Sequence, residues 1–201
     1  MTTVVWFKRD LRTRDHAPLA TAASLSEPVI PLYVIEDEYW QLPDTSGRQW
    51  AFIRDSLNDL DRQLRQAGNQ LLVVRGSVVD TLKQIQAHQG INRIFCHQET
   101  GGHWTFERDK AVIGWCSENQ VEFREWNQFG VVRRLRDRDI WDRAWTELMR
   151  QPVLDKPVAL PKSDSGQALF TGGGSRDPVL PDPCPDRQIG GSARGEKQLA
   201  S

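Results

Sequence analysis

Residues 3–12 read TVVWFKRDLR, a short run of β-branched and aromatic side chains that ends in charged residues. Because the run is apolar on both of its faces, it predicts a strand buried inside a parallel sheet. Lys8, Arg9 and Asp10 follow directly, so we expect them at the carboxyl end of that strand. Ligands of open parallel sheets bind beyond the carboxyl ends of the strands. The stretch therefore predicts both a fold class and the edge of the sheet where a site would lie.

Four more apolar runs follow, separated by stretches with helical patterning. They lie at residues 28–35, 70–74, 93–97 and 121–126. This alternation predicts an α/β fold, a doubly wound five-stranded parallel sheet of Rossmann-like type with right-handed crossovers. Pro31 lies inside the second run and lacks a backbone N–H, so we expect a defect or a late start in that strand.

Helices are expected between the strands. The longest is predicted over residues 48–67, where apolar residues recur at alternating spacings of four and three, with Gly68 as a stop. Asp15 is expected to cap a short helix that runs through Leu25. Another helix is expected after Ser77, and a further one over residues 103–117. The stripe of the longest helix comprises Ile53, Leu57, Leu60, Leu64 and Ala67.

The chain changes character after residue 126. Its eight tryptophans all lie at or before Trp145, where their expected role is packing, and the following residues are rich in Pro and Gly. We therefore expect an α/β domain at residues 1–130, a short amphipathic helix within 131–150 and a connector at 151–201. The connector has no core of its own, so it needs a partner surface if it is to be ordered.

Composition excludes several classes of protein. The formal net charge of the 201 residues is −1, which argues against a protein that coats nucleic acid. No apolar run reaches the roughly 18 residues of a membrane-spanning helix, and no signal peptide is apparent. Cys96, Cys116 and Cys184 are few and far apart, as is typical of buried thiols in a reducing cytosol. We expect a cytoplasmic protein.

Polar residues follow several predicted strands. Glu36, Asp37 and Glu38 end the second, while His97 and Glu99 end the fourth. Together with Lys8 and its neighbours they predict a ligand site at that edge of the sheet. Phosphate-binding glycine loops and the common hydrolase and metal motifs are absent. His16, His88 and His103 are expected at the surface. The residues alone thus indicate an α/β ligand-binding domain without a convincing catalytic centre.

A family resemblance goes further. Residues 6–12 (WFKRDLR), followed by Asp15-His16 and Pro18-Leu19, resemble the opening signature of the DNA photolyase and cryptochrome family, W-F-R-x-D-L-R-x-x-D-N/H-x-x-L. The second strand with its EDEYW ending, Gly47-Arg48 with Phe52, and residues 72–76 (LVVRG) are similar to later family motifs. The resemblance covers about residues 3–150. It departs at Lys8, where Arg is common, and in a longer loop at Gly101-Gly102.

The resemblance implies an antenna-binding α/β domain, followed in the family by a larger helical domain that binds FAD and damaged DNA. This chain is then an N-terminal portion, with residues 151–201 leading toward that helical domain and no catalytic residue of its own. The implied antenna is a folate, a deazaflavin or FMN, although some family members hold none. A monomer is expected. The implied antenna-binding residues are Lys8, Asp10, Glu36, Arg48, Phe52 and Glu99.

The function implied is light harvesting for a deoxyribodipyrimidine photolyase-like flavoprotein, a lyase that repairs pyrimidine dimers in DNA under blue light. An alternative is a cryptochrome-type blue-light photoreceptor without repair activity, since the first motif does not separate the two. A third reading is a stand-alone nucleotide-binding module of the electron-transfer flavoprotein or stress-protein kind. That reading leaves the WFKRDLR match unexplained.

Overall fold

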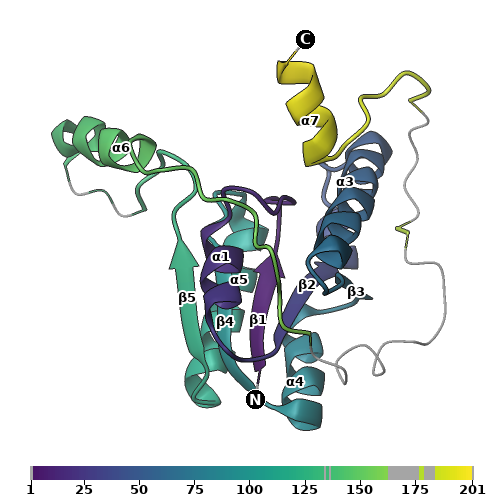
Figure 1. The fold of residues 1–201 in the computed structure, drawn as a ribbon, viewed down its shortest axis with the longest axis vertical. Coiled ribbons are helices and arrows are strands. Elements are labelled where there is room, and N and C mark those ends of the chain that lie inside the picture. Colours follow the sequence, from purple (N-terminus) through teal and green to yellow (C-terminus); the bar gives the residue numbers. More distant parts are fainter. Residues whose placement is uncertain (1, 134, 136, 163–176, 179–183, 201) are drawn as a thin grey trace.

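A computed structural model describes residues 2–133, 135, 137–162, 177–178 and 184–200. Five strands form one parallel sheet in the order β3-β2-β1-β4-β5 (Figure 1). The sequence prediction of a doubly wound five-stranded α/β fold is confirmed. The strands are β1 (Thr2–Phe7), β2 (Val29–Ile35), β3 (Leu72–Arg75), β4 (Ile91–His97) and β5 (Glu122–Trp126).

Helices cover both faces of the sheet. On one face lie α1 (Ala17–Ser24) and α3 (Gly47–Gln66), and on the other lie α4 (Val78–Gln89) and α5 (His103–Glu118). The short α2 (Asp37–Trp40) follows β2. Every residue of β1 is buried, with Val4 and Trp6 in the core beneath α4 and α5, and Val5 and Phe7 in the core beneath α1 and α3. Burial on both faces is why this strand reads as a continuous apolar run.

The expected defect at Pro31 is absent, because β2 is continuous and Pro31 pairs in register with Val5. The N–H of Val29 points away from β1 and donates to the carbonyl of Pro161 at 2.9 Å. Backbone groups alternate sides along a strand, so Pro31 faces the same way as Val29. On that side β3 begins only opposite Leu32, and no ladder bond from β3 is lost.

The first helix starts differently from the prediction. Asp15 has a positive φ of 52°, and the N-cap of α1 is His16, whose Nδ1 accepts a hydrogen bond from the N–H of Leu19 at 3.1 Å. The prediction that Asp15 caps this helix is therefore wrong. The prediction that His16 lies at the surface is wrong too, since its side chain is completely buried.

After β5 the chain forms a 3₁₀ turn at Arg138–Ile140 and then α6 (Trp141–Met149). Trp141 and Trp145 of α6 stack with ring centroids 6.2 Å apart and are about two-fifths exposed. The chain then returns to the domain, where Leu160 is buried beside α3 and Lys162 forms a bridge with Val29 at the edge of β2. Residues 163–176 and 179–183 of the predicted connector lie outside the described residues.

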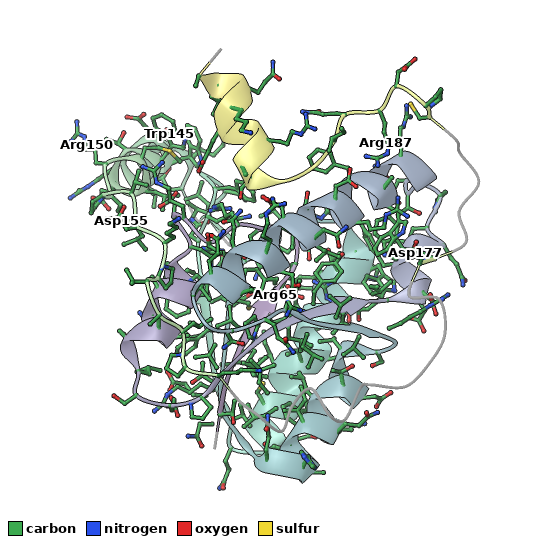
Figure 2. The ribbon with its side chains drawn as sticks, turned by 45° about the vertical axis from the view of Figure 1, so that its right-hand side comes forward. Arg65, Trp145, Arg150, Asp155, Asp177 and Arg187 are labelled. Atoms are coloured by element: carbon green, nitrogen blue, oxygen red, sulfur yellow. The ribbon has the colours of Figure 1, made fainter. Side chains whose placement is uncertain are left out.

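The C-terminal segment (residues 184–200) lies along α3 and ends in α7 (Ser192–Leu199) (Figures 1 and 2). Gly190 approaches α3 so closely that an added Cβ would lie 2.1 Å from the backbone oxygen of Phe52. Among the described residues, no helix is long and apolar enough to span a lipid bilayer. The three cysteines are free thiols, and Cys96 and Cys116 are buried.

Candidate functional site

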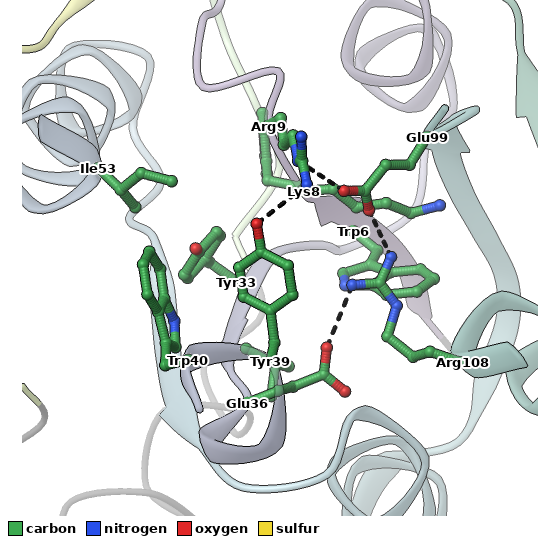
Figure 3. A pocket seen from close by; sticks show the side chains of 12 residues that line it. Trp6, Lys8, Arg9, Tyr33, Glu36, Tyr39, Trp40, Ile53, Glu99 and Arg108 are labelled. Atoms are coloured by element: carbon green, nitrogen blue, oxygen red, sulfur yellow. Dashed lines mark hydrogen bonds and ion pairs between the residues drawn. The ribbon is translucent and has the colours of Figure 1, made fainter. Parts of the chain in front are cut away.

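Arg108 of α5 is the centre of a charged cluster at the carboxyl ends of β1, β2 and β4 (Figure 3). Its Nη1 donates to Glu36 at 3.2 Å and its Nη2 to Glu99 at 2.6 Å. Its Nε and Nη2 also donate to Oδ1 of Asp109, at 3.1 and 2.8 Å, and the group lies over the ring of Trp6 at 4.8 Å from the centroid. The Arg108 side chain is 11% exposed, and a buried guanidinium that is paired with carboxylates and stacked on an aromatic ring is held rigidly in place.

Glu36 follows β2 and is the carboxylate of this cluster with the weakest partners. Its bond to Arg108 is 3.2 Å long, and its contact with the N–H of Val78, at the start of α4, is 3.5 Å. Burial raises the pKa of Glu36 to about 7, although Arg108 counteracts that shift. The group therefore titrates near neutral pH, where the charge of this edge of the sheet changes.

Arg9 and Glu99 join the ends of β1 and β4. Nε of Arg9 lies 2.7 Å from Oε1 of Glu99, and Nη2 of Arg9 donates to the hydroxyl of Tyr39 at 2.9 Å. Tyr39 belongs to α2 and packs against Trp40. Through these contacts, the aromatic side chains of α2 lie next to the charged cluster.

Lys8 points toward α5 and β5. Its Nζ lies 3.0 Å from Asp109 and 3.6 Å from Glu125, and it sits over the ring of Trp6 at 4.3 Å from the centroid. The side chain is 4% exposed, so it serves to neutralise buried carboxylates. Arg133, after β5, adds a further contact to Glu125 at 3.1 Å.

Of the cavities that adjoin this cluster, three have walls formed in part by α2. A small one of about 40 Å³ lies between Trp6, Tyr39 and Arg108 (Figure 3). A second, of about 480 Å³, lies between α2, α4 and α5, and its described walls include Glu36 and Trp104. The third, of about 490 Å³, lies between α2, α3 and the C-terminal segment, and we call it the α3 cavity. The described residues lining the α3 cavity are Arg9, Tyr39, Trp40, Arg48, Gln49, Phe52, Ile53, Cys184, Arg187 and Gln188.

Asp10, His16 and His97 form a separate buried group whose ligand atoms are close enough to suggest a metal site. Oδ2 of Asp10 lies 2.8 Å from Nε2 of His16 and 2.7 Å from Nδ1 of His97. However, Nδ1 of His16 accepts the N–H of Leu19, so the neutral ring carries its proton on Nε2, the atom that a metal would need. The geometry therefore favours a hydrogen-bonded group that connects the carboxyl ends of β1 and β4 to the N-terminus of α1.

The protonation states of Asp10 and His16 follow from their burial. Burial lowers the pKa of His16, against the attraction of Asp10. Burial alone would raise the pKa of Asp10, but the two histidines hold it well below its usual range. A neutral His16 and an ionised Asp10 are the states that the hydrogen bonds require.

The family model for DNA photolyase matches residues 3–133. The chain belongs to the DNA photolyase family. The match covers more than half of the chain, and it confirms the resemblance carried by WFKRDLR.

Known relatives of this photolyase-family chain include several cryptochromes. Cryptochrome-1 of Anopheles gambiae is 29% identical over 144 residues, covering 65% of this chain and 26% of that protein. Cryptochrome DASH of Natronomonas pharaonis is 33% identical over 116 residues, covering 55% of this chain and 24% of the relative. The chain thus spans about a quarter of the length of these relatives.

Solved structures of photolyases and cryptochromes share the fold. A Synechocystis cryptochrome matches with a TM-score of 0.77 and 20% identity over 98% of this chain and 45% of its own. An archaeal photolyase from Sulfolobus tokodaii, solved with two FAD molecules, matches with a TM-score of 0.71 and 21% identity over 100% of this chain and 46% of its own.

The site residues predicted from the photolyase resemblance fall into three places. Lys8, Glu36 and Glu99 belong to the charged cluster, although Glu99 is 6% exposed and already bonded to Arg9 and Arg108. Arg48 and Phe52, one helical turn apart on α3, line the α3 cavity. Asp10 lies outside both, because its carboxylate is taken up by two histidines.

Other residues at the site were not among those predicted. Arg108 directly precedes Asp109 in the sequence, and this Arg-Asp pair after the fourth predicted strand is the signal that could have placed it in the cluster. Tyr39 and Trp40 stand in the EDEYW ending of the second strand. Arg187 gave no sequence signal, because only the folded chain brings it beside α3.

The α3 cavity fits the antenna chromophores of the photolyase family in its donor chemistry. Tyr39, Trp40 and Phe52 offer aromatic surface, while Arg48 and Arg187 offer donors for anionic groups. Its volume falls within the roughly 300–1,000 Å³ typical of small-molecule sites. The small cavity beside Arg108 is too narrow for a ring system at about 40 Å³.

Proposed function

We propose that this chain is the light-harvesting domain of a photolyase-like flavoprotein that repairs pyrimidine dimers in DNA under blue light. The α3 cavity carries the proposal, because it joins aromatic walls and arginines at the carboxyl edge of a photolyase-type sheet. A folate, a deazaflavin or a flavin nucleotide is the chromophore class that these walls suit.

In this proposal the residues of the chain bind and orient the chromophore and take no part in bond breaking. Phe52 and Trp40 supply stacking surface, and Arg48 supplies a charged donor for an anionic group. Arg9 is held by Glu99 and Tyr39, which fixes its side of the cavity. A chromophore bound there supplies absorption of light and transfer of the excitation to a flavin.

The remaining partners belong to the same proposal. Catalytic FAD and damaged DNA would be held by a helical domain of the longer protein, as the length of the relatives suggests. The photolyase of Sulfolobus tokodaii, whose two FAD molecules imply a novel light-harvesting cofactor, offers a parallel for two bound chromophores. We further propose a cytoplasmic monomer.

Titration of the purified chain with candidate chromophores tests the proposal. We expect a folate, a deazaflavin or FMN to bind, as judged by quenching of its fluorescence, and both Arg48→Ala and Phe52→Ala to weaken that binding about tenfold. Arg65→Ala is the matched control, because Arg65 lies on the same helix outside the α3 cavity. Failure of all three classes to bind would overturn the proposal.

A photoreceptor without repair activity is the second candidate, favoured by the cryptochrome names of the relatives. The longer protein that carries this domain decides between the two when it is illuminated with a dimer-containing oligonucleotide. Loss of the dimers under blue light supports repair. Persistent dimers together with reversible photoreduction of the flavin support the photoreceptor.

A further inference from the structure

A further cavity, of about 190 Å³, lies at the carboxyl ends of β1 and β4 and beside the loop that follows β5; we call it the β4 cavity. The strand order β3-β2-β1-β4-β5 puts the topological switch point between β1 and β4, where open α/β sheets bind ligands. Among the described residues, it shares only Arg9 with the α3 cavity, whose outer wall is the C-terminal segment. The described residues lining the β4 cavity are Lys8, Arg9, Asp10, His97, Gln98, Glu99, Thr100, Gln128 and Phe129.

His97 brings a ring nitrogen without a partner to the β4 cavity. The residue is 4% exposed, and its Nδ1 lies 2.7 Å from Oδ2 of Asp10. Because an ionised carboxylate can only accept hydrogen bonds, the proton between the two groups lies on Nδ1. Nε2 of the neutral ring then carries a lone pair, and it makes no hydrogen bond to any described residue. His97 therefore offers the cavity an acceptor.

Two amide side chains add further hydrogen-bonding groups. The backbone N–H of Gln98 donates to the carbonyl of Trp126 at 2.8 Å, which fixes this end of β4 beside β5. The side-chain amide of Gln98 makes no hydrogen bond within the part of the chain that the structure describes. Oε1 of Gln128 accepts from Nη1 of Arg12 at 3.3 Å, which leaves the N–H donors of that amide for another partner.

The charged side chains of the lining already have partners of opposite charge or hydrogen-bonding partners. Nζ of Lys8 lies 3.0 Å from Asp109, and Nε of Arg9 lies 2.7 Å from Glu99. The carboxylate of Asp10 is shared by two histidines. The β4 cavity is therefore suited to a ligand group that is polar and uncharged.

Size and surface restrict the ligand further. Phe129 is 47% exposed and supplies an aromatic face. An engineered cavity of about 150 Å³ binds benzene, whereas sites for drug-sized ligands run from about 300 to 1,000 Å³. At about 190 Å³, the β4 cavity fits one small, flat ring system with donors and acceptors on its edge. Nucleobases combine these properties.

We propose that the β4 cavity binds the adenine base of a free nucleoside or nucleotide. Glutamine pairs with N6 and N7 of adenine through both polar atoms of its amide, and Gln98 would take this role. The second hydrogen on N6 would be donated to Nε2 of His97, and Phe129 would stack on the ring. The site is separate from the α3 cavity, so the proposal does not depend on the chromophore.

Calorimetric titration of the purified chain with adenosine and inosine tests the proposal, because inosine has a carbonyl in place of the 6-amino group. We expect adenosine to bind at least about tenfold more tightly than inosine. AMP is expected to bind within about threefold of adenosine, since the cations of the described lining are paired. A single-stranded oligonucleotide of deoxyadenosine is expected to compete no better than adenosine at equal concentration of adenine.

Two variants locate the binding site. Gln98→Leu removes an amide that has no hydrogen bond among the described residues, and we expect it to lower the affinity for adenosine about tenfold. His97→Asn removes the acceptor and is expected to have a similar effect. Thermal unfolding checks the fold of His97→Asn, and Gln98→Leu keeps the test valid if that variant unfolds. Gln84→Leu, at an exposed position of α4, is the matched control and is expected to leave the affinity unchanged.

Each contrary result overturns the proposal. Equal affinities for adenosine and inosine would mean that the amino group is not recognised. An affinity for AMP more than about tenfold above that for adenosine would mean that the phosphate dominates. Adenosine binding that neither Gln98→Leu nor His97→Asn weakens lies at another site. Stronger competition by the oligonucleotide would point to a nucleic acid as the source of the base. Absence of adenosine binding at millimolar concentration overturns the proposal and leaves the light-harvesting proposal standing.

Discussion

The carboxylate of Asp59 in α3 accepts a hydrogen bond from the backbone N–H of Ala193 in the first turn of α7, at 3.1 Å. Gly191, the N-cap of α7, has no side chain to do this, so a residue of another helix caps α7. Asp59 is 5% exposed, and its Oδ2 also lies 3.3 Å from the hydroxyl of Ser192. The α3 cavity depends on this anchor because α7 follows directly after its outer wall.

Asp59→Ala is expected to release the C-terminal segment from α3. Loss of a helix cap costs about 1 kcal/mol. Here that loss weakens the docking of α7 onto α3. Hydrogen exchange should show faster exchange at Ala193 and its neighbours, with protection of β1 unchanged. Glu118→Ala, at the exposed end of α5, is the control. Unchanged exchange in α7 would contradict the role of Asp59.

Gly190→Ala is expected to displace the same segment by steric overlap. The new methyl group would meet the backbone oxygen of Phe52, which cannot move without distorting α3. Limited proteolysis should then cut within residues 184–200 earlier than in the parent chain. Gly195→Ala is a matched control, because nothing lies within 4 Å of its Cβ position. Equal cleavage of both variants would contradict the close approach.

Acid should destabilise the domain through His16. Because the pKa of His16 is lowered in the fold, the unfolded chain binds more protons as the pH falls below about 6.5, and stability falls with it. His16→Asn keeps an acceptor for the N–H of Leu19 but does not titrate. We expect a smaller loss of Tm between about pH 7.5 and 5.5 in this variant. An equal loss in both proteins would contradict the assignment.

Arg108→Gln is expected to be the most destabilising single change at the charged cluster. It removes the cation that Glu36, Glu99 and Asp109 share, and breaking such a buried network costs about 3–5 kcal/mol. Urea unfolding followed by tryptophan fluorescence measures the loss. Arg65→Gln breaks an exposed pair with Asp61 and should change the free energy of unfolding by less than about 1 kcal/mol. Similar losses in both variants would contradict the network.

Glu36→Gln is expected to change the pH dependence of stability in the opposite direction to His16→Asn. The pKa of Glu36 is raised to about 7 in the fold, so near neutral pH the folded chain holds a proton that the unfolded chain has lost. The contribution of Glu36 to the free energy of unfolding therefore falls as the pH rises toward about 7. The variant has no such cost. Its free energy of unfolding relative to the parent is expected to rise between about pH 5.5 and 8. A constant difference would show that Glu36 titrates normally.

Local patterns predicted the sheet and its helices well. The stripe from Ile53 to Ala67 predicted a helix over residues 48–67, and the structure has it at Gly47–Gln66. Burial on both faces of β1 is why its apolar run predicted a strand inside a parallel sheet. The prediction of a defect at Pro31 was wrong, because the effect of a missing N–H depends on where the neighbouring strand β3 begins.

Long-range pairings could not be predicted in the same way. His16 looked exposed because its partners Asp10 and His97 come from two different strand ends. Arg187 and Asp55 are far apart in the chain and belong to no periodic pattern. Such contacts are decided by the packing of whole segments.

The bond between Asp59 and Ala193 also orders events during synthesis. The two residues are 134 positions apart, so α3 leaves the ribosome long before the segment that covers it. Translation at about 5–20 residues per second leaves several seconds in which the α/β sheet can fold while this side stays open. A newly made domain therefore presents its cavity to the surrounding solution first and gains the wall that carries Arg187 last.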